Sequence, residues 1–134
     1  MRSILASLAA LALLASTAQA APRLTPEEKL AKALEGRTAG KPVDCLYLRD
    51  IRSSRIFDRT AILYELNNGT YYLNRPEGGA QSLSWGDVLV TDTHSSQLCS
   101  IDIVRLFDTN PWMQNGFVNL GKFVPYKKVV ATRD

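Results

Sequence analysis

Histidine and cysteine are scarce in this 134-residue sequence. His94 is the single histidine, and Cys45 and Cys99 are the only cysteines, with no Cys-x-x-C pair. Zinc and copper sites need several such ligands close together, so we expect no metal site and no cofactor. The Gly-x-Ser-x-Gly turn that presents a nucleophilic serine in many hydrolases is also missing, and we assign no catalytic residue.

Strong charge of one sign is absent as well. The sequence has 16 Lys and Arg against 13 Asp and Glu, which gives a formal net charge of +3. Nucleic-acid-binding domains carry a much more basic face, so we expect no nucleic-acid partner. No apolar run approaches the ~20 residues that cross a bilayer, so we expect no membrane span.

Residues 1–20 have the pattern of a secretory signal peptide. Arg2 provides the positive start, residues 4–15 form an apolar core, and Ala18 and Ala20 are the small residues before a cleavage site. We expect cleavage after Ala20 to release a soluble periplasmic or secreted protein. No cysteine follows the apolar core, so we expect no lipid anchor.

The two cysteines fit an exported chain. Thiols oxidise in pairs outside the reducing cytoplasm, and Cys45 and Cys99 allow only one pairing. A disulfide that closes the loop between Cys45 and Cys99 would stabilise the domain by roughly 4 kcal/mol in the chain-entropy model. A reactive thiol and a metal site are the alternatives, and no motif supports either. We therefore predict a structural disulfide between Cys45 and Cys99.

Residues 21–42 predict one short N-terminal helix followed by a linker. Thr25 can cap the helix, Pro26 fits its first turn, and Glu28 completes a capping box with Thr25. Gly36 is a typical residue just beyond a helix C-terminus. The apolar stripe of this helix is short, so it must dock on the rest of the domain to be stable.

Residues 43–134 read as a β-rich domain of short strands and turns. The Asn-Gly pair at 68–69 predicts a tight hairpin between strands at 61–66 and 70–73. Pro125 predicts that the last strand lies at a sheet edge. About six or seven short strands with frequent turns favour a mainly β fold, a small antiparallel barrel or sandwich.

Several short phrases of the β-rich region recur in the same order in a known group of proteins. They are Cys45-Leu46-x-Leu48, Ile51-Arg52-Ser53-Ser54-Arg55, Asp58-Arg59-Thr60, Tyr71-Tyr72-Leu73-Asn74, Gln97-Leu98-Cys99-Ser100-Ile101-Asp102 and Leu120-Gly121-Lys122-Phe123-Val124-Pro125. Over roughly residues 43–126 the chain resembles an uncharacterised family of small exported proteins of Gram-negative bacteria, a domain of unknown function. The resemblance implies a periplasmic location and no particular activity. It also implies that Cys45–Cys99 is the first of two bridges found in that family, since this chain lacks the second cysteine pair.

Four arginines within eleven residues form the first candidate binding site: Arg49, Arg52, Arg55 and Arg59. The planar guanidinium fork binds phosphate, carboxylate or an anionic polysaccharide. Alternation along a strand would place Arg52 on the face opposite the other three. The alternative is a solvated strand face with Asp50 and Asp58 as local partners, and the sequence leaves both interpretations open.

A second candidate is the segment at 92–96, which holds Asp92, His94 and Ser95. These are the residue types of a hydrolase triad, and histidine is the usual general base near neutral pH. Triads assemble from separated segments, however, so a polar turn is the favoured interpretation. A small periplasmic hydrolase that combines scattered Asp and Ser residues with His94 stays the alternative function.

The two tryptophans lie in different predicted settings. Trp85 begins a predicted strand and is expected in the core, whereas Trp112 lies in a predicted loop at 108–116 and is a candidate contact residue. We therefore predict a non-enzymatic exported domain. It would bind an envelope protein or an anionic envelope component through Trp112 and the arginines of segment 49–59, with its oligomeric state left open.

Overall fold

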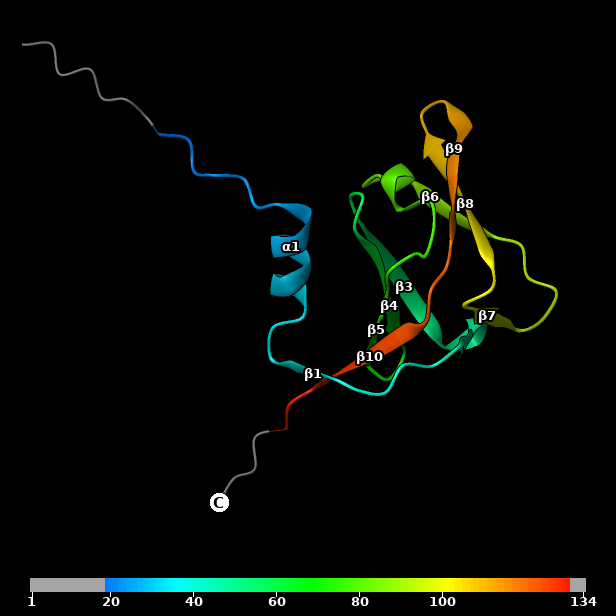
Figure 1. Ribbon diagram of the computed structural model, residues 1–134, viewed down its shortest axis with the longest axis horizontal. Helices are drawn as coiled ribbons and strands as arrows, with labels where there is room; N and C mark the ends of the chain where they lie inside the picture. Colours follow the sequence, from blue (N-terminus) through cyan, green and yellow to red (C-terminus); the bar gives the residue numbers. More distant parts are fainter. Residues whose placement is uncertain (1–18, 131–134) are drawn as a thin grey trace, which may run out of the picture.

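The computed structural model describes residues 19–130. The predicted signal peptide lies outside this range apart from its last two residues. Within the range, one α-helix, two 3₁₀ helices and ten strands follow one another (Figure 1). In chain order they are α1 (Pro26–Ala33), β1 (Arg37–Ala39), β2 (Cys45–Tyr47), η1 (Leu48–Asp50), β3 (Ile51–Phe57), β4 (Ala61–Leu66), β5 (Tyr71–Asn74), η2 (Ala80–Ser82), β6 (Val88–Thr91), β7 (Gln97–Cys99), β8 (Ile103–Thr109), β9 (Trp112–Asn119) and β10 (Phe123–Lys128).

The predicted mainly β fold with one α-helix is confirmed. The strands form three antiparallel sheets: a five-stranded sheet in the order β1-β10-β5-β4-β3, a three-stranded sheet β6-β8-β9, and the pair β2-β7. The described residues hold ten strands instead of six or seven, because several strands have only three or four residues. The five-stranded sheet ends at β1 and β3 and does not close into a barrel. No helix in the described part of the chain has the length and apolar character needed to cross a membrane.

The N-terminal helix begins as its sequence predicts. The Thr25 hydroxyl accepts a hydrogen bond from the Glu28 N–H at 3.2 Å, and the Glu28 carboxylate accepts one from the Thr25 N–H at 2.6 Å. The hydrogen bond from the Thr25 N–H, together with a smaller contribution from the Thr25 hydroxyl, lowers the pKa of the Glu28 carboxyl group. Gly36 follows the helix with a φ of 71°, a left-handed conformation that favours glycine. The capping-box prediction is confirmed.

The five-stranded sheet is covered on both faces. In β4, side chains alternate between two buried environments, as the two periodic faces of a strand require. Ala61 and Leu63 join Leu30 of α1 in one apolar cluster. Ile62 and Tyr64 point the other way, into the main core beside the second sheet. Figure 1 shows this order, with α1 on one side of the strands and β8 and β9 on the other.

The β4–β5 hairpin confirms the turn prediction at Asn68-Gly69. The Leu66 N–H donates to the Thr70 carbonyl at 3.0 Å, and the Gly69 N–H donates to the Leu66 carbonyl at 2.9 Å. Gly69 has a φ of 82°, which closes a three-residue loop without a Cβ penalty. The turn therefore fixes the register of the two central strands.

Strand β1 lies inside the stretch predicted as a linker, so that part of the prediction is wrong. It pairs with β10, and the β10 strand that carries Pro125 therefore lies between β1 and β5 instead of at the sheet edge. The Gly40 N–H donates to the Pro125 carbonyl at 2.7 Å. The proline nitrogen faces the same neighbouring segment, where β1 has just ended, so its missing N–H interrupts no ladder hydrogen bond.

The predicted disulfide is confirmed. Cys45 of β2 and Cys99 of β7 lie directly opposite each other, and their sulfur atoms are bonded. Strand β2 leads through η1 into β3 of the five-stranded sheet, and β7 precedes β8 of the three-stranded sheet. The bridge therefore links the two main sheets covalently.

Candidate binding surfaces

The three-stranded sheet has a covered face and an open face. In β8, Val104 and Leu106 are fully buried in the main core, whereas Ile103 is exposed. Arg105 and Phe107 alternate with the buried residues and point away from the core. These outward side chains form an open side of the sheet, on which Ile103, Trp112 and Phe117 are exposed to solvent.

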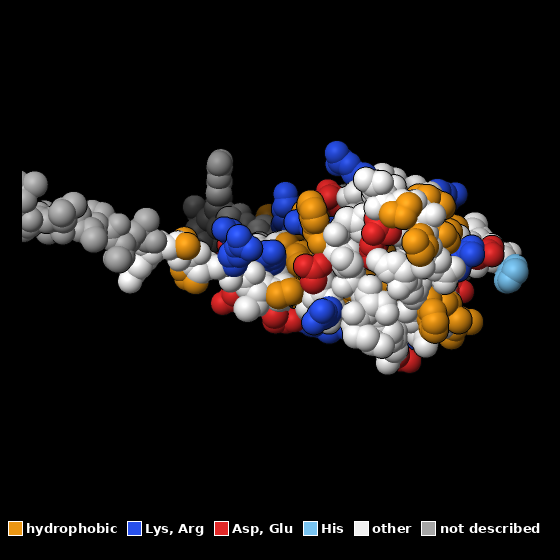
Figure 2. All heavy atoms as spheres, turned by 90° about the horizontal axis from the view of Figure 1, so that it is seen from above, with side chains coloured by type: hydrophobic (Ala, Val, Ile, Leu, Met, Phe, Trp, Pro, Cys, Tyr) orange, Lys and Arg blue, Asp and Glu red, His pale blue; other side chains and the backbone are white. Residues whose placement is uncertain are grey.

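We call this open side the outer face. Alternation, register and ring stacking place there Val88, Val90, Ile103, Arg105, Phe107, Trp112 and Phe117, and the same register places the polar residues Thr109, Gln114 and Asn119 on it. Trp112 is 63% exposed and Phe117 is 51% exposed. The rings of Phe107 and Trp112 stack with centroids 5.1 Å apart. Seen from above, hydrophobic side chains gather at the end of the molecule that holds β8 and β9, away from α1 (Figure 2).

Arg105 lies in the middle of the outer face. Its register partners are Val90 on β6 and Phe117 on β9, and its guanidinium lies 5.8 Å from the centre of the Phe107 ring. Within residues 19–130, no carboxylate lies within 4.0 Å of this guanidinium. The outer face therefore surrounds one half-buried cation with apolar side chains.

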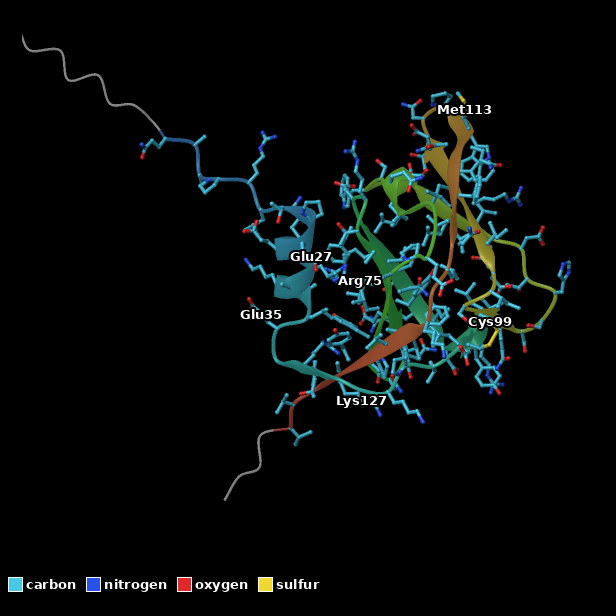
Figure 3. All side chains as sticks on the ribbon, in the orientation of Figure 1. Glu27, Glu35, Arg75, Cys99, Met113 and Lys127 are labelled. Carbon is cyan, nitrogen blue, oxygen red and sulfur yellow. A yellow bond between two sulfur atoms is a disulfide. The ribbon has the colours of Figure 1, made fainter. Side chains whose placement is uncertain are left out.

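Trp112 is part of a strand, so the prediction of a loop at 108–116 is wrong. Strands β8 and β9 continue into that segment and turn at Asn110-Pro111, whose peptide bond is cis. A β-bulge in β9 next to Gln114 shifts the register of the pairing with β8, and the strand continues beyond it to its end. Figure 3 shows Met113 at the tip of this hairpin, far from Cys99 in β7.

The arginine series divides into two pairs. Arg49 lies in η1 with its Nε 3.8 Å from the Asp50 carboxylate, and Arg52 on β3 lies 4.0 Å from Glu65. Asp50 is one of the two partners expected for a solvated face, whereas the other contact comes from Glu65 and the Asp58 carboxylate accepts a hydrogen bond from the Trp85 N–H instead. Arg55, near the end of β3, and Arg59, in the turn that follows, lie instead around a common hollow region.

This region consists of two adjoining hollows of about 530 and 760 Å³ at the junction of α1, the β3–β4 turn and the segment after η2. Both are lined by Pro26, Asp58 and Trp85. We call it the Trp85 groove and define it by six residues: Pro26, Lys29, Arg55, Asp58, Arg59 and Trp85. It shares no residue with the outer face.

The placement of Trp85 contradicts its predicted place in the core, because its side chain is 76% exposed. The strand expected from residue 83 begins only at Val88, and the preceding segment forms η2 and a turn. Leu83 takes the buried position instead and is only 2% exposed. The core needs one side chain from this turn, and Leu83 fills that place.

The backbone around Trp85 is tied to the β3–β4 turn. The Trp85 N–H donates a hydrogen bond to the Asp58 carboxylate. The Arg59 N–H donates to the Leu83 carbonyl at 3.0 Å. Arg59 itself has a φ of 53°, the left-handed region that side-chain-bearing residues seldom adopt. The exposed tryptophan and Arg59 are therefore held on neighbouring, fixed segments.

His94 lies in the exposed loop between β6 and β7. Hydrogen bonds in that loop join Thr93 to Ser95 and Ser95 to Gln97. Within the described range, His94 forms neither a hydrogen bond nor an ion pair with a serine or a carboxylate. The same part of the chain contains no group of three or more His, Cys, Asp or Glu side chains arranged to hold a metal ion.

Comparison of the chain with protein-family models, with curated proteins and with solved structures finds no match. The functional interpretation therefore rests on the two surfaces. Trp112, Arg55 and Arg59 were candidates from the sequence, whereas Arg105 and the exposure of Trp85 were not predicted. The alternation Ile103-Val104-Arg105-Leu106-Phe107 is the signal for Arg105, because a strand with Val104 and Leu106 in the core must direct its neighbours outward.

Proposed function

We propose that this protein is a non-enzymatic binding domain of the bacterial envelope that recognises another protein through the outer face. The observation that carries the proposal is the combination of exposed apolar side chains and an unpaired arginine on one side of a regular sheet. Contiguous apolar patches on a folded surface mark interaction sites. Tryptophan and arginine are also the residue types that dominate binding energy at protein interfaces.

The chemistry of the outer face specifies its partner further. A protein that covers Phe117 and Trp112 also removes water from Arg105. An arginine that loses water without gaining an acidic partner weakens binding, whereas a matched carboxylate offsets that loss. The complementary surface is therefore apolar and carries an aspartate or glutamate opposite Arg105.

A second copy of the chain is a poorer occupant. In a symmetric dimer the same patch meets itself, so two Arg105 guanidinium groups would approach each other in an apolar interface. Like charges at such positions oppose association. The proposal therefore assigns a different protein to the outer face.

Location in the envelope is supported by three features that point the same way. Cys45 and Cys99 are joined, and such bridges form and persist in oxidising compartments. The predicted signal peptide at residues 1–20 and the resemblance to small exported proteins favour the same address. The hydrolase alternative has less support, because His94 lies on an exposed loop without an acidic or serine partner in the described residues.

Affinity capture with matched variants tests the proposal. The immobilised mature domain is exposed to an envelope extract of the host as the wild type, as Arg105→Glu and as Ile101→Ser. Ile101 is the control, because it is 90% exposed yet lies in the turn before β8, outside the outer face. We expect one protein to be retained by the wild type and by Ile101→Ser, with retention at least about 30-fold weaker for Arg105→Glu.

Two results would overturn the proposal. One is equal retention of the captured protein by the wild type and Arg105→Glu. The other is a dimer of the purified domain in sedimentation that Arg105→Glu dissociates, since the outer face would then be covered by a second copy. Circular dichroism of each variant verifies that the fold is intact.

A further inference from the structure

We infer that the Trp85 groove is a separate site for an anionic oligosaccharide whose sugar rings carry carboxylates. The inference does not depend on the proposed function, because the groove and the outer face share no residue. An exposed tryptophan, three cations and several hydroxyl and amide side chains meet at the groove. Each of these components matches one part of a carboxylated sugar.

Trp85 provides the platform for a sugar ring. Its side chain is largely exposed at the point shared by both hollows. Its backbone is fixed to Asp58, and the neighbouring Leu83 is anchored in the core. A tryptophan on a fixed backbone has few torsions left to order when a sugar ring stacks on its flat face. The exposed Trp85 on its fixed turn is therefore suited to stack on a flat ring of a ligand, and it contributes little to the core.

The groove has an excess of positive charge. Lys29 and Arg55 line the first hollow and Arg59 the second. Asp58 is the only acidic residue in the lining of either hollow, and it already accepts a hydrogen bond from the Trp85 N–H. Among residues 19–130, no carboxylate lies within 4.0 Å of the three cations. They are thus available for carboxylates of a ligand, which arginine binds in bidentate fashion.

The backbone of Arg59 supports a role for its side chain. A left-handed φ costs an ordinary residue about 1 kcal/mol or more, and glycine or asparagine is the usual occupant. Arginine occupies this strained position beside Trp85, with its side chain along the second hollow. The turn hydrogen bonds from the Arg59 N–H to the Leu83 carbonyl at 3.0 Å and from the Thr60 N–H to the Phe57 carbonyl at 2.9 Å hold this backbone, so the arginine is presented at the groove from a fixed position.

The remaining lining favours a sugar over an acidic peptide. Thr60, Gln81, Ser82 and Ser84 supply hydroxyl and amide groups that can exchange hydrogen bonds with sugar hydroxyls. The apolar residues Ile56, Phe57 and Leu83 also border the hollows, but all three are buried. The apolar side chains of the lining that stay accessible are therefore Pro26 and Trp85. One such ring is enough for a sugar to stack on, whereas peptide recognition uses separate pockets for alternate side chains.

Tryptophan fluorescence of the mature domain tests the inference. The variant Trp112→Phe leaves Trp85 as the sole tryptophan of the chain, so any change in emission reports on the groove. The probes are tetragalacturonate, the neutral sugar maltotetraose and the acidic peptide tetraglutamate, each titrated into the millimolar range. We expect saturable quenching by tetragalacturonate, weakening as ionic strength rises from about 0.01 to 0.15 M.

Three variants distinguish the groove from general surface charge. Arg55→Ala and Arg59→Gly should each weaken tetragalacturonate binding about tenfold. Arg59→Gly should at the same time leave the thermal midpoint unchanged or raised, because glycine removes the backbone strain. Arg52→Ala is the matched control on the same strand, with Glu65 as its neighbour, and should bind like the parent.

The inference is overturned by any of three outcomes. Tetragalacturonate causes no saturable change, or maltotetraose binds equally well, or tetraglutamate binds as tightly as the sugar. The last outcome would assign the groove to an acidic peptide. None of these results bears on capture by the outer face, so the two proposals fail independently.

Discussion

The two larger sheets of this protein differ in how many of their faces are covered. The five-stranded sheet has α1 on one side and the second sheet on the other, and five of the six residues of β4 are buried. The three-stranded sheet buries only Val104, Leu106 and Val118 on its inner side. Its outer face presents Phe117 and Trp112 to solvent. The first sheet therefore provides the core, and the second provides a surface.

In the proposed function, this difference separates stability from recognition. Burying an apolar side chain stabilises a fold by about 1.5–3 kcal/mol, and the five-stranded sheet uses nearly all of its apolar residues in this way. The apolar side chains of the outer face stay exposed in the isolated chain. The free energy of burying them would contribute to binding when a partner covers the face.

Two phenylalanines give the sharpest comparison. Phe123 begins β10 and is fully buried, whereas Phe117 on β9 is 51% exposed. Phe123→Ala should lower the free energy of unfolding by about 3–5 kcal/mol, because it leaves a cavity in the main core. Phe117→Ala should lower it by less than about 1 kcal/mol. Urea denaturation measures both, and similar losses for the two variants would remove the distinction between the sheets.

The disulfide joins the two sheets and should matter nearly as much. Replacing both cysteines, Cys45→Ser with Cys99→Ser, should lower the free energy of unfolding by about 2–4 kcal/mol, because the unfolded chain regains the freedom of a long loop. The wild type measured with and without a reductant provides the control. If reduction leaves the free energy of unfolding unchanged, the disulfide does not stabilise the association of the two sheets.

Tyr64 offers a smaller effect of opposite sign. Its ring packs edge-on against Phe123, and its buried hydroxyl has no hydrogen-bond partner among the described residues. Burial also raises its pKa, because the phenolate cannot be solvated there. Tyr64→Phe removes the unsatisfied group and should raise the free energy of unfolding by about 1 kcal/mol. A loss of stability in urea would show that the hydroxyl has a partner.

The smallest effect concerns the attachment of α1 to the five-stranded sheet. Glu27 of α1 and Arg75 after β5 point toward each other and form an ion pair at 2.6 Å (Figure 3). The hydrogen bond from Arg75 lowers the pKa of Glu27 from its ordinary value of 4.5. Because the pair is exposed, Glu27→Gln should cost less than about 0.5 kcal/mol at neutral pH.

The pH dependence of that small effect has a definite sign. A carboxyl group with a lowered pKa in the folded state stabilises the fold above pH 4.5 and loses this contribution as the pH falls through the lowered value. The wild type and Glu27→Gln should therefore differ in stability at pH 7 and converge below pH 4.5. Thermal unfolding at several pH values tests this, and a difference that grows on acidification would contradict it.

Local signals in the sequence predicted local structure well. The capping box at Thr25 and the Asn68-Gly69 hairpin involve only neighbouring residues, and both formed as expected. The pairing of Cys45 with Cys99 followed from there being no other cysteine. Each of these features has a cause that lies within a few residues or in a simple count, so the sequence alone was sufficient.

Features that depend on distant contacts were harder to predict. Strand β1 has little β character of its own and forms because β10 offers a free edge beside it. Trp85 was expected in the core because it is large and apolar, yet Leu83 from the same turn fills the available space. Tertiary packing decides which of two nearby apolar side chains is buried. That packing depends on distant residues, so it could not be predicted from the local sequence.

The most direct test of the outer face as a binding surface is site-specific photo-crosslinking in the host cells. A photo-reactive amino acid is placed at position 117 on the outer face and, separately, at position 101 in the exposed turn before β8. We predict one adduct of defined mass from position 117, none from position 101, and loss of the adduct when Arg105→Glu is added. No adduct from position 117, or an equal adduct from position 101, would contradict the account.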